Sequence, residues 1–498
     1  MSGDPSVSGT ITVRWGASDQ PAGQRADTHI LEHAWFLSTS GRETGEIDRL
    51  LEDIGADVSA ATSRDAIILS FTAPKASWRD AIVLITERML RPVLVPAELA
   101  AEKVPFLTEV ALLREDSQRN ILDVLLTASA GPAYAASTGE PSRLASPDIA
   151  ALAALQKSIV VPGRISVALA GDIEREDARN VITACFPDTP GPRLRRDTRE
   201  PSATTRMATL ALTSPNTLAT SVFIPTSTGK SGGELAASHA ADLAIVNVIQ
   251  QALRTQLTAS IPASKNALPQ LTDASAVSVL HRGITGVLLR IDHSASASQP
   301  VDTFLAALKA AQSLIADESQ ATGIITATRR IWAEQAALPA QVVARQAEWD
   351  AIDEPDGPQQ LLKALSVLTP AQLSEHIDRV ALRFSLRQEV KLGDFRMTSR
   401  TQPLQERRIP QFRFPVQSAS VSPSGLTAVF LKMLASPDFP AFLQSRLARM
   451  RQERPDRSSR RNWVLSAGLA LWMMAKPSQF GVFARRTQLI FRKRCRLY

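Results

Sequence analysis

The sequence predicts an α+β protein of two tandem α/β repeats of about 200 residues each, followed by a basic C-terminal extension. Strand-like and helix-like patterns alternate over residues 9–186, and a similar alternation recurs loosely over 205–400. Connectors rich in proline and arginine follow each repeat, at 187–202 and 402–416. A chain of 498 residues is also too long for one hydrophobic core. We therefore expect domains at 1–195, 203–400 and 411–498.

The first repeat is expected to begin with a strand and a helix. Residues 9–16 alternate in polarity, which is typical of a strand. Residues 24–38 have helical periodicity, and Asp27 or Thr28 would cap that helix. The further elements expected are a helix at 43–56, two strands within 57–74, a helix at 77–92, a helical stretch at 96–130, a helix at 146–160 capped by Ser146, a buried strand at 164–173 and a helix at 174–186.

The second repeat shows the same kinds of pattern in a weaker form. No motif shared with the first repeat is strong enough to prove an internal duplication. The expected elements are strands at 207–214 and 219–226, a helix at 239–257, a strand at 286–294 and a helix at 300–316.

Charge is distributed unevenly along the chain. Residues 411–498 carry 16 Lys/Arg and 3 Asp/Glu, a balance of +13, whereas the whole chain has a net charge of +7. The body is therefore mildly acidic, with a balance of −6, and no specific nucleic-acid binding is expected of it. The tail has three interpretations: weak contact with a membrane surface, non-specific nucleic-acid binding, or a disordered extension.

The two cysteines, Cys185 and Cys495, allow neither a disulfide framework nor a cysteine-based zinc site. Cys185 is expected in the core. The start has no signal-peptide pattern, which favours a cytoplasmic location for the sequence as written, or a periplasmic one if the true start lies upstream.

Two histidines and a glutamate lie within five positions, in the sequence His29-Ile30-Leu31-Glu32-His33. On a helix, His29 and His33 are one turn apart on the same face, so both imidazoles can bind one Zn²⁺. Glu32 lies close to that face, where its carboxylate can act as general base toward a water on the metal. The order H-x-x-E-H inverts the usual zinc-protease motif. These residues need a third ligand from a separate helix.

The sequence resembles the pitrilysin/insulinase family of zinc metallopeptidases, including its bacterial members similar to mitochondrial processing peptidase. In that family the third ligand is a glutamate 76 residues after the second histidine, and Glu109 stands at that distance from His33. A second acidic residue stands seven positions earlier, where this chain has Glu102. Specific motifs carry the resemblance over residues 10–190, and only pattern and length carry it over 205–400.

The resemblance implies a half-clamshell fold, in which each repeat is a mainly antiparallel sheet covered by helices. It also implies one Zn²⁺ per chain, held by His29, His33 and Glu109, with Glu32 as general base and Glu102 assisting. The expected activity is endopeptidase cleavage of short or unfolded peptides in a chamber that a second half-molecule closes, in a homodimer or heterodimer. For substrate binding it implies Ser59 and Ala60, where the family often has Asn-Ala, and Arg254 in the second repeat.

Several departures from the family support an alternative, a catalytically inactive homologue that serves as a structural or partner subunit. The chain has only two tyrosines, Tyr134 and Tyr498, and neither suits the substrate-binding tyrosine of the family's second repeat. The sequence starts one expected strand late. Pro105 falls between the two glutamates, where it would kink the helix and rotate Glu109 relative to Glu102. The other histidines are expected to be surface or hydrogen-bonded residues: His239, His281, His293 and His376.

Overall fold

The structure is a computed structural model that describes residues 5–21, 24–115, 117–135, 147–186, 193–194, 196, 201, 203–212, 216–259, 271–294 and 300–390. The chain divides into two units, Met1–Arg396 and Met397–Tyr498. The basic tail at 411–498 lies outside the described residues, as does Ser146. No helix among the described residues is long and apolar enough to span a membrane.

The first sheet has four antiparallel strands in the order β2-β3-β1-β4. These strands are β1 (Ser6–Val13), β2 (Asp57–Thr62), β3 (Ile67–Pro74) and β4 (Ile165–Gly171). The associated helices are α1 (Arg25–Ala34), α2 (Glu46–Asp53), α3 (Trp78–Leu90), α4 (Pro96–Glu115), α5 (Ser117–Ala130), α7 (Ile149–Ile159) and α8 (Arg175–Cys185). The 3-10 helix η1 (Ala17–Asp19) leads from β1 toward α1.

The second sheet has five strands in the order β7-β8-β6-β5-β9. They are β5 (Arg206–Ala211), β6 (Thr217–Thr228), β7 (Leu271–His281), β8 (Ile284–Ser294) and the short β9 (Gln388–Glu389), which pairs in parallel with β5 while the other pairs are antiparallel. The helices are α9 (Gly232–Ala259), α10 (Pro300–Ala316), α11 (Glu318–Ala336), α12 (Pro339–Ala351), α13 (Gly357–Val367) and α14 (Pro370–Ser385). The α+β fold with two mainly antiparallel sheets is therefore confirmed.

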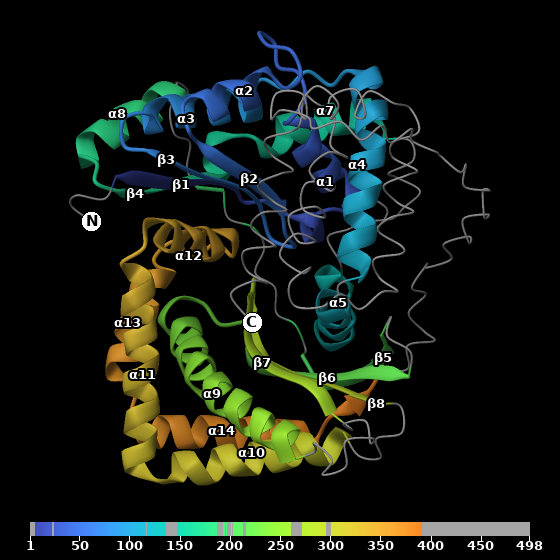
Figure 1. Ribbon diagram of the computed structural model, residues 1–498, viewed down its shortest axis with the longest axis vertical. Coiled ribbons are helices and arrows are strands. Elements are labelled where there is room, and N and C mark those ends of the chain that lie inside the picture. Colours follow the sequence, from blue (N-terminus) through green and yellow to red (C-terminus); the bar gives the residue numbers. More distant parts are fainter. Residues whose placement is uncertain are drawn as a thin grey trace, which may run out of the picture. The chain divides into compact units, whose positions relative to one another are not determined.

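Each sheet receives one helix from the other half of the chain. Helix α12 packs against β1 and β4, and α5 packs against β5 and β6 (Figure 1). Side chains of α5, among them Leu125 and Leu126, share a core with Phe223 of β6 and Leu288 of β8. Both sheets are thus covered on both faces, which explains why most of β1 and β8 is buried. This exchange of helices was not expected from the sequence.

Several expectations about helix caps and burial were wrong. Helix α1 begins at Arg25, so Asp27 and Thr28 lie inside it and are buried rather than capping it. The cap of α7 is Asp148, whose carboxylate accepts a hydrogen bond from the Ala151 N–H at 3.1 Å. Strand β4 is half-buried along its whole length, not buried. Cys185 is half-buried on α8, a helix without fully buried residues.

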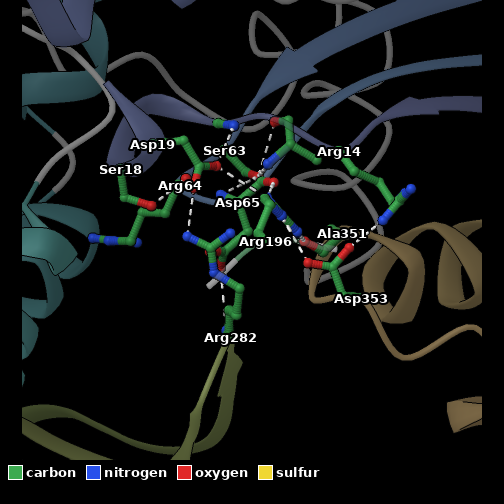
Figure 2. Close-up of polar contacts among 12 residues, drawn as sticks. Arg14, Ser18, Asp19, Ser63, Arg64, Asp65, Arg196, Arg282, Ala351 and Asp353 are labelled. Atoms are coloured by element: carbon green, nitrogen blue, oxygen red, sulfur yellow. Dashed lines mark hydrogen bonds and ion pairs between the residues drawn. The ribbon is translucent and has the colours of Figure 1, made fainter. Parts of the chain in front are cut away.

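The two repeats meet at a network of arginines and aspartates. Arg196, in the proline-rich connector, donates to Asp19 at 3.0 Å and to Asp353 at 2.8 Å (Figure 2). Arg282, at the β7–β8 turn, donates to the other oxygen of Asp19 at 2.5 Å. Arg14 contacts Asp353 as well. Asp19 closes η1, just before α1, so this network fixes the start of the segment that carries His29 and His33.

Candidate metal centre

Helix α1 carries two histidines on one face because they are one turn apart. The ring centroids of His29 and His33 are 5.0 Å apart. His29 is buried and His33 is half-buried. His29 and His33 therefore lie on one helix, as predicted.

Helix α4 lies beside α1 and brings Glu109 to these rings (Figure 1). Glu109 Oε2 is 3.3 Å from His33 Nε2, and Glu109 Oε1 is 3.9 Å from His29 Nε2. One potential ligand atom from each of the three residues lies within 4.8 Å of the others. Neighbouring ligands of a tetrahedral zinc ion, with bonds of about 2.0–2.1 Å, are about 3.3 Å apart. Two imidazoles and one carboxylate at these separations fit zinc.

Glu102 contacts the same histidine from the opposite ring nitrogen. Its Oε1 lies 3.0 Å from His33 Nδ1. A carboxylate on the far nitrogen fixes the orientation of a metal-binding imidazole and raises its basicity. Helix α4 continues through Pro105, whose ring lies on the exposed side, so both glutamates stay on the face toward α1. Glu102 and Glu109 both contact His33, so Pro105 keeps neither of them from the site.

Phe106 packs against both histidines. Its ring centroid is 4.5 Å from that of His29 and 4.7 Å from that of His33. The side chain is only 4% exposed. It therefore excludes water from one side of both imidazoles and limits their rotation.

The protonation of His33 reflects these neighbours. Burial alone would lower the pKa of His33, but hydrogen bonds with Glu102 and Glu109, together with the charge of Glu32, outweigh burial and raise this pKa to about 9. Without a metal, His33 therefore carries a proton at neutral pH. A metal ion bound to His33 has to displace that proton.

Glu32 is held by a residue of the adjacent sheet. The Thr62 hydroxyl, at the end of β2, donates to Glu32 Oε2 at 2.6 Å. Glu32 is 5% exposed, so its carboxylate lies within the buried surroundings of the histidines. Neither Thr62 nor Phe106 was expected at the site from the sequence. Phe106 is four residues after Glu102, so helical periodicity could have found it, whereas the reach of Thr62 depends on packing.

Ser59 and Ala60 lie on β2, an edge strand of the first sheet. They pair with Ser70 and Leu69 of β3 on one side. Ser59 is exposed and Ala60 is buried. The strand that carries Thr62 therefore also carries both expected substrate-binding residues of the first repeat.

Arg254 is not joined to this cluster by any contact among the described residues. It lies on α9, and its side chain is exposed. Its expected role in substrate binding stays a prediction.

Three of the remaining histidines are hydrogen-bonded, as predicted. His376 contacts Asp242 at 2.8 Å, His293 contacts Thr220 at 2.8 Å, and His281 contacts Asp65 at 3.2 Å. His239 is buried, and burial lowers its pKa to about 4. Among the described residues, His29, His33 and Glu109 form the one group of three that could hold a metal ion.

Comparison with known proteins finds a family match over the part of the chain that carries this cluster. Residues 2–141, which include all five residues of the cluster, match the model of the insulinase family (peptidase family M16). A stretch of 183 residues, 36% of this chain, is 24% identical to an uncharacterized zinc protease of Mycobacterium leprae. The match spans 41% of that relative. These similarities support an insulinase-family domain within residues 2–141.

Solved structures share the fold at low sequence identity. A protease from Helicobacter pylori superposes with a TM-score of 0.61 at 13% identity, over 75% of this chain and 90% of that chain. A peptidase M16 inactive domain from Pseudomonas fluorescens superposes with a TM-score of 0.60 at 15% identity, over 76% of this chain and 90% of that one. The half-clamshell fold expected from the sequence is therefore confirmed.

Proposed function

We propose that this protein is a zinc-dependent endopeptidase of the insulinase family, related to the bacterial members that resemble mitochondrial processing peptidase. One observation carries the proposal: the ligand atoms of His29, His33 and Glu109 lie within 4.8 Å of one another. Glu32, which lies between the two histidines on α1, has its carboxylate near enough to His33 to raise the pKa of that ring.

His29, His33 and Glu109 would hold the metal, and Glu102 would orient His33 through Nδ1. When bound, zinc supplies a Lewis acid that polarises a peptide carbonyl and makes water more acidic. The carboxylate of Glu32 then accepts the proton of the attacking water. It returns this proton to the departing amide nitrogen, so that the peptide bond is exchanged for an acid and an amine.

Strand β2 gives the substrate a place beside this site. It is the edge strand of the sheet as far as the structure describes it, and an extended peptide would add to it through backbone hydrogen bonds at Ser59 and Ala60. Pairing of this kind requires an extended segment, which favours short or unfolded peptides. A second half-molecule, either another copy of this chain or a related chain, would close the chamber. Arg254 would approach the peptide from the second repeat.

The test compares the wild type with Glu32→Gln for bound zinc and for cleavage of a quenched peptide library. We expect about one zinc per chain in both proteins. Cleavage should fall about 10²–10⁴-fold in Glu32→Gln, because general acid–base catalysis contributes about that much.

Two results would overturn the proposal. A wild type that binds stoichiometric zinc but cleaves nothing, alone or mixed with a related half-molecule, would identify an inactive partner subunit. A wild type that binds no zinc would refute the metal centre itself.

A further inference from the structure

The hydrogen bond between Thr62 and Glu32 joins β2 of the first sheet to helix α1. Its length, 2.6 Å between Thr62 Oγ1 and Glu32 Oε2, is typical of a hydroxyl that donates to a charged carboxylate. The two residues are 30 positions apart in sequence. The contact therefore depends on the packing of α1 against β2 and not on local chain geometry.

The position of Thr62 is fixed by the strand register and by the turn that follows. Thr62 pairs with Ile67 of β3. The turn is closed by a hydrogen bond from Ser63 N–H to the Ala66 carbonyl at 2.8 Å, and the Ser63 hydroxyl accepts from the Ala66 N–H at 3.0 Å. Thr62 therefore cannot easily follow a movement of Glu32.

The same turn is anchored to the rest of the molecule. The Ser18 N–H donates to the Arg64 carbonyl at 3.0 Å, and Arg196 donates to the Asp65 carbonyl at 2.5 Å (Figure 2). His281 of the second repeat contacts the Asp65 carboxylate. The hydroxyl that meets Glu32 therefore stands on a frame to which both repeats contribute.

A glutamate needs such support in order to act as a base at one place. Its side chain has three rotatable bonds, and fixing a side chain of this kind costs up to about 2 kcal/mol of conformational entropy. A rigid donor that holds one carboxylate oxygen meets this cost before the substrate arrives. A carboxylate without that donor reaches the productive geometry only part of the time.

We propose that Thr62 is a positioning residue, whose hydroxyl holds the carboxylate of Glu32 in the orientation that accepts the proton of water. This inference rests on the endopeptidase function proposed above. A purely structural role for Thr62 in β2 would depend on its β-branched shape and not on its hydroxyl. Two substitutions separate these roles: Thr62→Val keeps the shape and removes the hydroxyl, and Thr62→Ser keeps the hydroxyl.

The experiment measures kcat, KM, bound zinc and thermal stability for the wild type, Thr62→Val and Thr62→Ser. The matched control is Thr72→Val, because the Thr72 hydroxyl binds Ser8 on the same sheet at 2.9 Å. We expect Thr62→Val to lower kcat about tenfold or more, because a misplaced catalytic group can cost up to about 100-fold in rate, with KM and zinc content unchanged. Thr62→Ser should recover most of kcat, and Thr72→Val should leave it unchanged.

A double substitution tests whether Thr62 acts through Glu32. In the Glu32→Gln background, Thr62→Val should cause no further loss of the residual activity. A full additional loss would show that Thr62 has a role independent of Glu32. Unchanged kcat in Thr62→Val, in an active wild type, would overturn the inference.

A readout independent of activity is the crystal structure of the zinc-free Thr62→Val protein. We expect the Glu32 carboxylate to leave the position it has in the wild type or to occupy several rotamers. A single unchanged rotamer would refute the positioning role. A wild type without activity, combined with a displaced Glu32 in Thr62→Val, would instead refute the proposed function alone.

Discussion

Each of the two repeats places a histidine beside a carboxylate, but the ratio of carboxylates to histidines differs. In the first repeat, two histidines of α1 meet Glu102 and Glu109 of α4, and Glu32 adds a third carboxylate. In the second repeat, one histidine, His376, meets one carboxylate, Asp242, which is fully buried. The first group has three carboxylates for two histidines and therefore an excess of negative charge, whereas the second has one carboxylate for one histidine.

This difference explains why only the first group is suited to a cation. Thr226 donates to the second oxygen of Asp242 at 2.7 Å, so both oxygens already have partners within the fold. Arg379 approaches the other ring nitrogen of His376 at 3.1 Å, where a metal would be repelled. A histidine next to a carboxylate is therefore suited to a metal ion only where the negative charge of the surrounding carboxylates is not already balanced by other side chains.

The largest effect should come from removing the third ligand of the first group. Glu109→Gln should lower zinc affinity at least about 100-fold, because the loss of a ligand exceeds the 10–100-fold effect of residues that only support ligands. Competition with a chelator measures this affinity. Glu98→Gln is the control, since Glu98 lies on the same helix and binds Ser38. Equal zinc affinity in Glu109→Gln and the wild type would contradict the assigned ligand set.

The second repeat should respond in stability and not in metal binding. His376→Leu leaves the buried carboxylate of Asp242 without one of its partners and should lower the free energy of unfolding by about 3 kcal/mol. Denaturant unfolding measures this change. Glu375→Gln, on the same helix, removes an exposed pair with Arg379 and should cost no more than about 0.5 kcal/mol. Zinc loss in His376→Leu, with the fold intact, would contradict the assignment of the metal site to the first repeat alone.

A smaller effect is expected where a carboxylate supports a ligand without binding the metal. Glu102→Gln keeps an oxygen near His33 Nδ1 but loses the charge that raises the basicity of the ring. Zinc affinity should fall about tenfold. A loss as large as that of Glu109→Gln would show that Glu102 is itself a ligand, and no loss would remove its supporting role.

A pH-dependent change in stability is expected from His239 of the second repeat. Burial lowers the pKa of His239 from 6.5 to about 4, so the unfolded chain binds its proton more readily. Its contribution to stability is complete above pH 6.5 and is lost as the pH falls toward 4, by roughly 2 kcal/mol at pH 5. His239→Gln should therefore unfold less steeply with acid. Identical pH dependence of the wild type and His239→Gln in denaturant unfolding would contradict this prediction.

The raised pKa of His33 acts in the opposite sense in the zinc-free protein. Its stabilising effect is present below pH 6.5 and is lost as the pH rises through about 9.

The sequence determined the parts of the site that depend on local geometry. Residues i and i+4 of a helix always share a face, so the placement of His29 and His33 follows from the chain alone. The same periodicity puts Glu102 and Glu109, two turns apart, on one face of α4. Pro105 lies within α4 on its exposed side, and both glutamates still contact His33.

Only the tertiary structure decided where these faces meet. Glu109 reaches the histidines, and Thr62 reaches Glu32, because helices and strands that are distant in sequence pack together to bury their apolar sides. The exchange of α5 and α12 between the sheets has the same cause. Hydrophobic periodicity shows which side of an element is buried, but it does not name the partner, since burial is non-directional and many partners would satisfy it equally.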